Sequence, residues 1–208
     1  MIKTLKILLV IFVAVFLLNG CIVVKNEDES KEYVPVLHLS PQPDIPMSDV
    51  MIRSTQGDML AFLPKDWFLV NVEESAPTDV IAVSVNPEYS MSAIFSQIRK
   101  TPQMDTTVAK EGLLALARLA LDKRAKKTAG SVKHIGKYST INMGPRIFAM
   151  YEFTNSDSSM TGTSAVFKST LNEYYEMTVI PINLKGIVVP AKSDIDKVFN
   201  SILTTIHY

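Results

Sequence analysis

The residue types that most often do chemistry in proteins are few in this chain of 208 residues. It holds one cysteine, Cys21, and three histidines, His38, His134 and His207. No histidine has a second histidine or a cysteine at the spacing of metal ligands. The Gly-x-Ser-x-Gly, P-loop and Gly-x-Gly-x-x-Gly patterns are missing as well. We therefore expect no catalytic residue, no metal and no cofactor, so that the chain is not expected to be an enzyme, and the single thiol becomes the first residue to explain.

Cys21 follows a hydrophobic run at the start of the chain. Lys3 and Lys6 make a short basic start, and residues 7–18 are wholly apolar. This run is too short to span a bilayer as an unassisted helix, which needs about 20 residues. A basic start, a short apolar core and a small residue before the break are typical of a secretory signal peptide. We therefore expect residues 1–20 to direct export and to be removed.

The four residues Leu18-Asn19-Gly20-Cys21 resemble the lipobox of bacterial lipoproteins, in which leucine, a small residue, and glycine or alanine precede the cysteine. The resemblance implies that the chain is cut between Gly20 and Cys21. It also implies that a diacylglycerol, with acyl chains such as palmitate, is attached to the Cys21 sulfur. Together with an amide-linked acyl chain this would hold the protein firmly at a membrane, because stable anchoring needs two or more chains.

Two other interpretations of this stretch remain open. If the apolar segment continues through residues 22–24, it reaches the lower limit for a membrane-spanning helix, and Cys21 is then a small buried residue. Alternatively, an ordinary signal peptide is cut nearby. The cysteine count favours the lipoprotein, since a lone cysteine forms no intramolecular disulfide and stands where a lipoprotein requires it.

The residues after Cys21 bear on location. Ile22 stands where an aspartate would favour retention in the inner membrane of many Gram-negative bacteria. The sequence therefore predicts the outer membrane, with the protein on its periplasmic face. The acidic residues Glu27, Asp28 and Glu29 keep the cell surface as an alternative location, because some bacterial groups mark surface-exported lipoproteins with acids soon after the cysteine. The inner membrane is the other alternative.

Composition divides the rest of the chain in two. Within residues 21–49, the part from residue 25 onward is polar and charged and then rich in proline. Proline fixes the backbone and lacks an N–H donor, so we expect a lipidated N-terminus and a semi-rigid tether without a helix or central strand. Residues 50–208 have the length of one domain with a sizeable core. The chain's 21 basic and 21 acidic residues do not give the basic excess that nucleic-acid binding usually shows.

Charge clusters in residues 50–208 suggest two candidate sites. Five lysines and arginines follow Asp122 with no acid between them: Lys123, Arg124, Lys126, Lys127 and Lys133. They predict a basic patch that could face lipid head groups or an acidic envelope protein, although a solvated helix end would have the same charges. Glu73 and Glu74 could form a paired-carboxylate or cation site, although they too are explained as solvated residues.

Hydrophobic periodicity predicts strands before and after a helical stretch. Alternating or β-branched segments bounded by turn residues are typical of strands. We expect strands over residues 59–64, 67–73, 80–87 and 91–100, and again over 131–141, 146–153, 162–170 and 173–181. Strands joined by such short turns pair antiparallel, because a parallel pair needs a long crossover.

Two helices are expected among these strands. Residues 105–127 lack proline and are rich in strong helix formers, with Asp105 or Thr106 as the cap. Residues 193–206 carry a clear apolar stripe and begin with Ser193 as the expected cap. Each one-sided helix must bury its stripe on a sheet. The sequence therefore predicts an α+β fold, with a central antiparallel sheet flanked by a long middle helix and a C-terminal helix.

Phe62, Pro64 and Trp67 lie in a segment that resembles the opening hairpin of PsbP-like proteins, with Asp66 in place of their common glycine. The order of the expected elements over residues 50–208 is similar too. This superfamily includes photosystem-associated PsbP proteins, DcrB-type bacterial lipoproteins and a Ran-binding nuclear-transport protein. The resemblance implies an α/β/α sandwich that is used for binding and assembly, with Trp67 as a core anchor.

Three functions follow from these expectations. The first is a non-enzymatic envelope lipoprotein that binds or helps assemble another protein at the membrane. The second is a chaperone or carrier for an apolar ligand or segment, with a groove between sheet and helix. The third is an unrecognised hydrolase, which the missing nucleophile and base disfavour. A large apolar cavity would favour the second function over the first.

Overall fold

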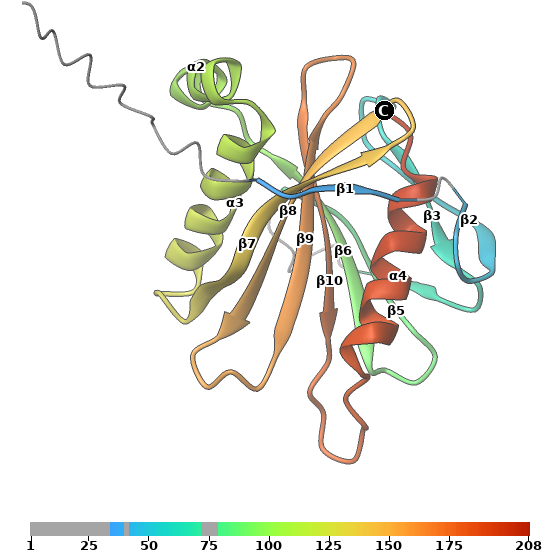
Figure 1. Ribbon diagram of the computed structural model, residues 1–208. Coiled ribbons are helices and arrows are strands. Elements are labelled where there is room, and N and C mark those ends of the chain that lie inside the picture. Colours follow the sequence, from blue (N-terminus) through green and yellow to red (C-terminus); the bar gives the residue numbers. More distant parts are fainter. Residues whose placement is uncertain (1–33, 40–41, 72–78) are drawn as a thin grey trace, which may run out of the picture. The chain divides into compact units, whose positions relative to one another are not determined.

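Eight strands form the central sheet of the computed structural model, in the order β1-β7-β8-β9-β10-β6-β5-β4 (Figure 1). The structure describes residues 34–39, 42–71 and 79–208. The central strands are β1 (Val36–His38), β4 (Phe68–Val70), β5 (Val80–Val85), β6 (Met91–Ile98), β7 (Val132–Met143), β8 (Arg146–Asn155), β9 (Thr161–Lys168) and β10 (Tyr174–Pro181). All neighbours pair antiparallel except β1, which pairs parallel with β7.

Three helices and a small second sheet cover the central sheet. The helices are α2 (Pro102–Glu111), α3 (Leu113–Lys127) and α4 (Lys192–Thr205). Strands β2 (Met47–Arg53) and β3 (Leu60–Pro64) form the two-stranded sheet. Among the described residues, no helix is both long enough and apolar enough to cross a membrane.

Side chains alternate between two hydrophobic cores along the central strands. Phe148 and Phe167 pack in the core that includes α4 and β3, whereas their neighbours Ala149 and Val166 pack in the core that includes α2 and α3. Successive side chains of a strand point to opposite faces, so the helices lie on both faces of the sheet. This confirms the predicted α+β class, and the sheet with its flanking helices forms an α/β/α sandwich.

The C-terminal helix packs as its apolar stripe predicts. Residues Ile195, Val198, Phe199, Ile202, Leu203 and Ile206 are all buried. The expected cap was wrong, because α4 begins after Ala191, in extended backbone, and no side chain caps it. The stripe placed the helix correctly since burial, and not capping, decides where a helix with one apolar face lies.

The expected middle helix is two helices. Residues 105–127 were predicted as one element, but α2 ends at Glu111 and α3 begins at Leu113. Gly112 between them has φ +76° and ψ −168°, which a side chain would strongly disfavour. The start was also wrong, since the Thr101 hydroxyl accepts a hydrogen bond from the Met104 N–H and caps α2 ahead of Asp105.

The domain begins earlier than expected. Residues from Val34 onward belong to the same compact unit as the rest of the domain, so the predicted boundary at Val50 is too late. The Pro35 carbonyl accepts a hydrogen bond from Thr140 N–H, and β1 adds an edge strand to β7. Leu39 and Ile45 pack against the α4 core. Prolines are compatible with this path because the strand is short and lies at the edge.

The expected hairpin at Phe62–Trp67 is also corrected. Strand β3 pairs with β2, whereas β4 pairs with β5 in the central sheet, so the two segments belong to different sheets. Asp66 in the turn between them has φ +67°, a conformation that suits glycine and that aspartate tolerates better than most residues. Trp67 is buried in the core with α4, as the resemblance implied.

Candidate functional site

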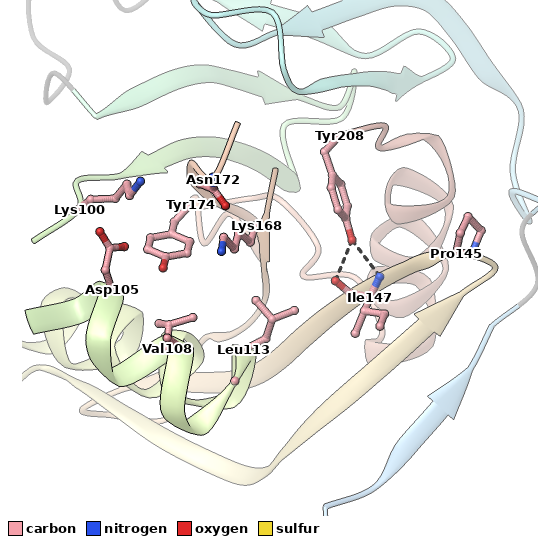
Figure 2. A pocket seen from close by; sticks show the side chains of 12 residues that line it. Lys100, Asp105, Val108, Leu113, Pro145, Ile147, Lys168, Asn172, Tyr174 and Tyr208 are labelled. Atoms are coloured by element: carbon pink, nitrogen blue, oxygen red, sulfur yellow. Dashed lines mark hydrogen bonds between the residues drawn. The ribbon is translucent and has the colours of Figure 1, made fainter. Parts of the chain in front are cut away.

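A pocket of about 700 Å³ opens where α2 gives way to α3 (Figure 2). Gly112 lines it, and a side-chain carbon at Gly112 would meet no atom within 4 Å. Lys168 at the end of β9 and Tyr174 at the start of β10 line it from the sheet. The pocket therefore lies beside the same glycine that divides the predicted helix.

The walls of the pocket are mainly apolar. Val108 and Leu113 come from the two helices, and Figure 2 shows them across the pocket from Tyr174 and Lys168 of the sheet. Ile147 of β8 completes the wall, and 47% of its surface is exposed to solvent. Such a large apolar side chain at an open pocket is available for contact with a ligand.

Tyr208 holds one end of the pocket. Its hydroxyl donates a hydrogen bond to the Ile147 carbonyl (2.9 Å) and accepts one from the Ile147 N–H (2.8 Å), as Figure 2 shows. Its ring stacks on Phe167 with centroids 4.8 Å apart. The C-terminal residue is thus fixed on β8, and the pocket wall that it forms is ordered before any ligand arrives.

Polar groups line the pocket from both sides, with Asp105 on α2 and Lys168 and Tyr174 on the sheet. Tyr174 lies directly opposite Lys168 in the β9–β10 pair, so both side chains are on the same face of the sheet. Burial and a hydrogen bond with Asp105 raise the pKa of Tyr174 to about 12. Lys100 lies 3.7 Å from the Glu173 carboxylate and 5.7 Å from the centre of the Tyr174 ring. No ion pair of the described residues includes Lys168, which is exposed.

The predicted basic cluster lies at the other end of α3, and its members have different roles. Lys123 and Lys127 both donate to the Asp79 carboxylate, at 2.8 and 3.0 Å. Burial of Asp79 raises the pKa of its carboxyl, but the hydrogen bonds and charges of the two lysines outweigh this effect and lower it to about 2. These two lysines therefore link α3 by ion pairs to Asp79, the residue before β5.

Arg124 of the same cluster points inward. Its Nη2 lies 2.9 Å from both the Glu176 carboxylate and the Thr178 hydroxyl, and its guanidinium lies 4.6 Å from the centre of the Phe153 ring. The Tyr151 hydroxyl also donates to Glu176. Burial alone would raise the pKa of the Glu176 carboxyl, but the Arg124 charge and these hydrogen bonds lower it.

The remaining two basic residues are exposed and lie apart. Lys126 borders a second pocket of about 640 Å³ whose wall includes Arg99, Met104 and Leu119. Lys133 lies on β7 and does not line that pocket. The structure thus brings together Lys123, Lys126 and Lys127 around this second pocket and separates them from Lys133.

The other sequence candidates do not form a site in the described part of the chain. His134 stacks on Tyr138 with ring centroids 4.2 Å apart, and burial lowers its pKa. The backbone of His207 pairs with Leu60. No group of three or more histidine, cysteine, aspartate or glutamate side chains within residues 34–39, 42–71 and 79–208 could hold a metal ion.

Two sequence candidates lie outside the described residues. These are the lipobox, with Gly20 and Cys21, and the acidic pair Glu73–Glu74. Sequence reasoning offered a groove between sheet and helix as an alternative but identified none of the residues of the pocket of Figure 2, because its walls come from α2, α3, β8, β9, β10 and Tyr208. The available signal was Gly112, a glycine inside an otherwise strong helical pattern.

Comparisons with known proteins give similarities of fold. No family model matches the chain, and no curated protein sequence matches it. The chain is similar to cyanobacterial PsbP (CyanoP) from Synechocystis sp. PCC 6803, at 14% identity over 76% of this chain and 91% of that one, with a TM-score of 0.49. It is also similar to the Ran-binding protein Mog1p of Saccharomyces cerevisiae, at 11% identity over 77% and 95%, with a TM-score of 0.49.

Proposed function

We propose that this chain is a lipid-anchored bacterial envelope protein whose α+β domain binds an apolar ligand without catalysis. The observation that carries the binding function is the pocket of Figure 2. Its volume of about 700 Å³ lies within the range of about 300–1,000 Å³ that is usual for small-molecule sites. A mainly apolar wall that also carries polar groups is usual for such sites.

This pocket favours the carrier function over a purely structural role in assembly. The backbone groups of β9 and β10 beside it are paired in the sheet, and Tyr208 fixes its far wall on Ile147. A largely preformed pocket binds with little ordering of the protein, which leaves more of the interaction free energy for affinity. The apolar wall supplies that affinity through burial.

The binding function is tested with a neutral fluorescent probe. N-phenyl-1-naphthylamine should bind the processed chain, residues 21–208 with Cys21→Ser, and gain fluorescence. Ala109 lines the pocket from the exposed side of α2, so Ala109→Trp should fill the pocket and abolish probe binding. Ala191→Trp, at the exposed start of α4, is the matched control and should bind normally. If both variants bound the probe equally well, this pocket would be excluded as the binding site of the probe.

The anchor is tested at Cys21. The lipobox-like residues support lipidation there, and Ile22 supports the outer membrane, with the domain in the periplasm. Cys21→Ser should abolish the incorporation of radiolabelled palmitate and leave the signal segment uncut by lipoprotein-type processing. Palmitate labelling of the serine variant would exclude Cys21 as the lipid site. Cofractionation with inner-membrane markers would contradict the proposed location, and protease accessibility on intact cells would indicate the cell surface.

A second candidate function is docking of an acidic envelope protein at the basic end of α3. The pocket of about 640 Å³ that Lys126 and Arg99 border supports it, since its wall combines these basic side chains with apolar Met104 and Leu119. Arg99→Ala with Lys126→Ala should reduce recovery of the partner from solubilised envelopes. Normal recovery of the partner by this double variant would exclude the surface as the docking site. The control variant Lys133→Ala should recover the partner as well as wild type does.

A further inference from the structure

We propose that the pocket of Figure 2 binds a single-chain anionic amphiphile, with its negative head group at Lys168 and its hydrocarbon tail against Leu113 and Ile147. This inference rests on the proposed ligand-binding function and adds the chemical class of the ligand. Three sets of observations carry it: the charges around the pocket, the position of Lys168, and the pairing of the β10 and Ile147 backbone beside it.

The charges around the pocket leave one cation unmatched. Lys100, Lys168 and Asp105 are the charged residues of its wall. Asp105 is hydrogen-bonded to Tyr174, and Lys100 lies beside Glu173. Lys168 has no ion-pair partner within the described residues. A negative group on a ligand would supply the missing ion-pair partner of Lys168. A cationic ligand would instead be repelled by the two lysines of the wall.

The position of Lys168 suits a head group at the edge of an apolar surface. Lys168 is the last residue of β9, on the same face of the sheet as buried Val166. Its cross-strand neighbour Tyr174 is buried as well. The Lys168 side chain is exposed, so an anion can approach it from solvent while the apolar wall of the pocket lies beside it. A long ligand bound there by its head would extend over Leu113 and the half-exposed Ile147.

The backbone beside the pocket disfavours a peptide as the occupant. β10 is paired with β6 and with β9 along the pocket, and the N–H and C=O groups of Ile147 are both taken by the Tyr208 hydroxyl. A bound peptide would have to bury its own amide groups with few partners. A hydrocarbon chain has no such groups, so an acyl chain fits the pocket better than an acidic peptide does.

The test compares amphiphiles that share one tail and differ in head-group charge. Dodecanoate, 1-dodecanol and dodecyltrimethylammonium displace N-phenyl-1-naphthylamine from residues 21–208 with Cys21→Ser, below their micelle concentrations at pH 7.5. Dodecanoate should bind about 10- to 100-fold more tightly than dodecanol, as expected for one hydrogen-bonded charge pair. Dodecyltrimethylammonium should bind most weakly.

Variants of Lys168 separate charge from shape. Lys168→Met should reduce dodecanoate affinity to that of dodecanol and leave dodecanol binding unchanged. Lys168→Glu should reverse the preference toward dodecyltrimethylammonium. Lys137→Met, an exposed lysine of β7 that does not line the pocket, is the control and should bind dodecanoate normally. Circular dichroism should show the same fold in all variants.

The outcomes distinguish this inference from the function on which it rests. Equal affinity for dodecanoate and dodecanol, or an unchanged dodecanoate affinity in Lys168→Met, would exclude a preference for anionic ligands. The proposed binding of apolar ligands in this pocket would be unaffected by that result. Tighter binding of an acidic peptide than of dodecanoate would overturn the choice of amphiphile. Failure of the naphthylamine probe to bind would overturn both the proposed function and this inference.

Discussion

Arg124 and Glu176 form an ion pair beneath α3, with Nη2 2.9 Å from Oε1 and with only 23% and 10% of their side chains exposed. The pair joins the last turns of α3 to the middle of β10. A buried ion pair of this kind is weak evidence for stability in itself, since both charges lose hydration. Its consequence is that neither partner can be removed alone without leaving a buried charge.

We therefore expect Arg124→Met to lower the free energy of unfolding by about 3–5 kcal/mol, because the Glu176 carboxylate would remain buried without its cation. Arg124→Met combined with Glu176→Gln should be distinctly more stable, since the amide can still accept from the Tyr151 hydroxyl. Urea unfolding at pH 7 measures both. A double variant as unstable as the single one would show that the arginine contributes through packing on Phe153.

Asp79 should make part of the stability depend on pH. Its pKa is lowered to about 2, below the value of 3.8 expected when unfolded. A lowered folded pKa gives stability that is complete above the unfolded pKa and is lost as the pH falls through the folded pKa. Because Lys123 and Lys127 are 37% and 51% exposed, we discount the effect for solvent screening to roughly 1–2 kcal/mol.

Wild type should accordingly exceed Asp79→Asn by this amount from about pH 7 to pH 5, and the difference should shrink between about pH 4 and pH 2. Urea unfolding across this pH range provides the measurement. High salt should reduce the difference at neutral pH, since exposed ion pairs are screened. A difference that stays constant down to pH 2 would assign the effect to something other than the aspartate charge.

Residues 34–49 should stabilise the domain. A chain that begins at Val50 loses the β1 ladder, the packing of Leu39 and Ile45, and the hydrogen bond from Asp44 N–H to the Ser201 hydroxyl. Full burial of a large apolar side chain contributes about 1.5–3 kcal/mol. Leu39 and Ile45 are half-buried, so together they should contribute roughly 2–3 kcal/mol, to which the lost β1 ladder adds. Thermal unfolding of chains beginning at residues 21, 34 and 50 would measure this. The first two should unfold alike, and equal stability of the third would make this segment dispensable.

Phe199 should be critical to the packing of α4. Its side chain is only 1% exposed in the core that joins α4 to the sheet. Phe199→Ala should cost about 3–5 kcal/mol, a large part of the ~5–15 kcal/mol usual for a domain. Exposed Lys133→Ala should change stability by about 0.5 kcal/mol or less. If the midpoints of thermal unfolding of the two variants were equal, α4 would not be part of the core.

The sequence was most informative where one local pattern decided the structure. The stripe from Ile195 to Ile206 predicted α4 because its period shows directly which face is buried. Strand β1 was missed since it has three residues next to prolines and depends on distant β7 for its pairing. Gly112 was overlooked in a segment of strong helix formers, although glycine weakens a helix by about 1 kcal/mol relative to alanine.

The candidate site depended more on long-range contacts. Arg124 was predicted as part of a basic surface, yet it lies one helical turn after buried Ala120 and so continues the apolar face of α3. That position was a signal that it faces the sheet, but its partner Glu176 could not be known without the fold. The pocket of Figure 2 could not be predicted for the same reason, because it needs the position of Tyr208 relative to Ile147.

Strand β1 has a mechanical consequence. Any pull on the chain before Val34 reaches the domain first through the three β1–β7 residue pairs, from Val36–Thr140 to His38–Asn142. This short parallel ladder would yield first, while the antiparallel β7–β10 meander still holds. If the chain is anchored at Cys21 as proposed, separation of this edge strand would lengthen the connection between anchor and domain before the rest of the domain unfolds. Single-molecule pulling from residue 21 should show a small early extension before the domain unfolds.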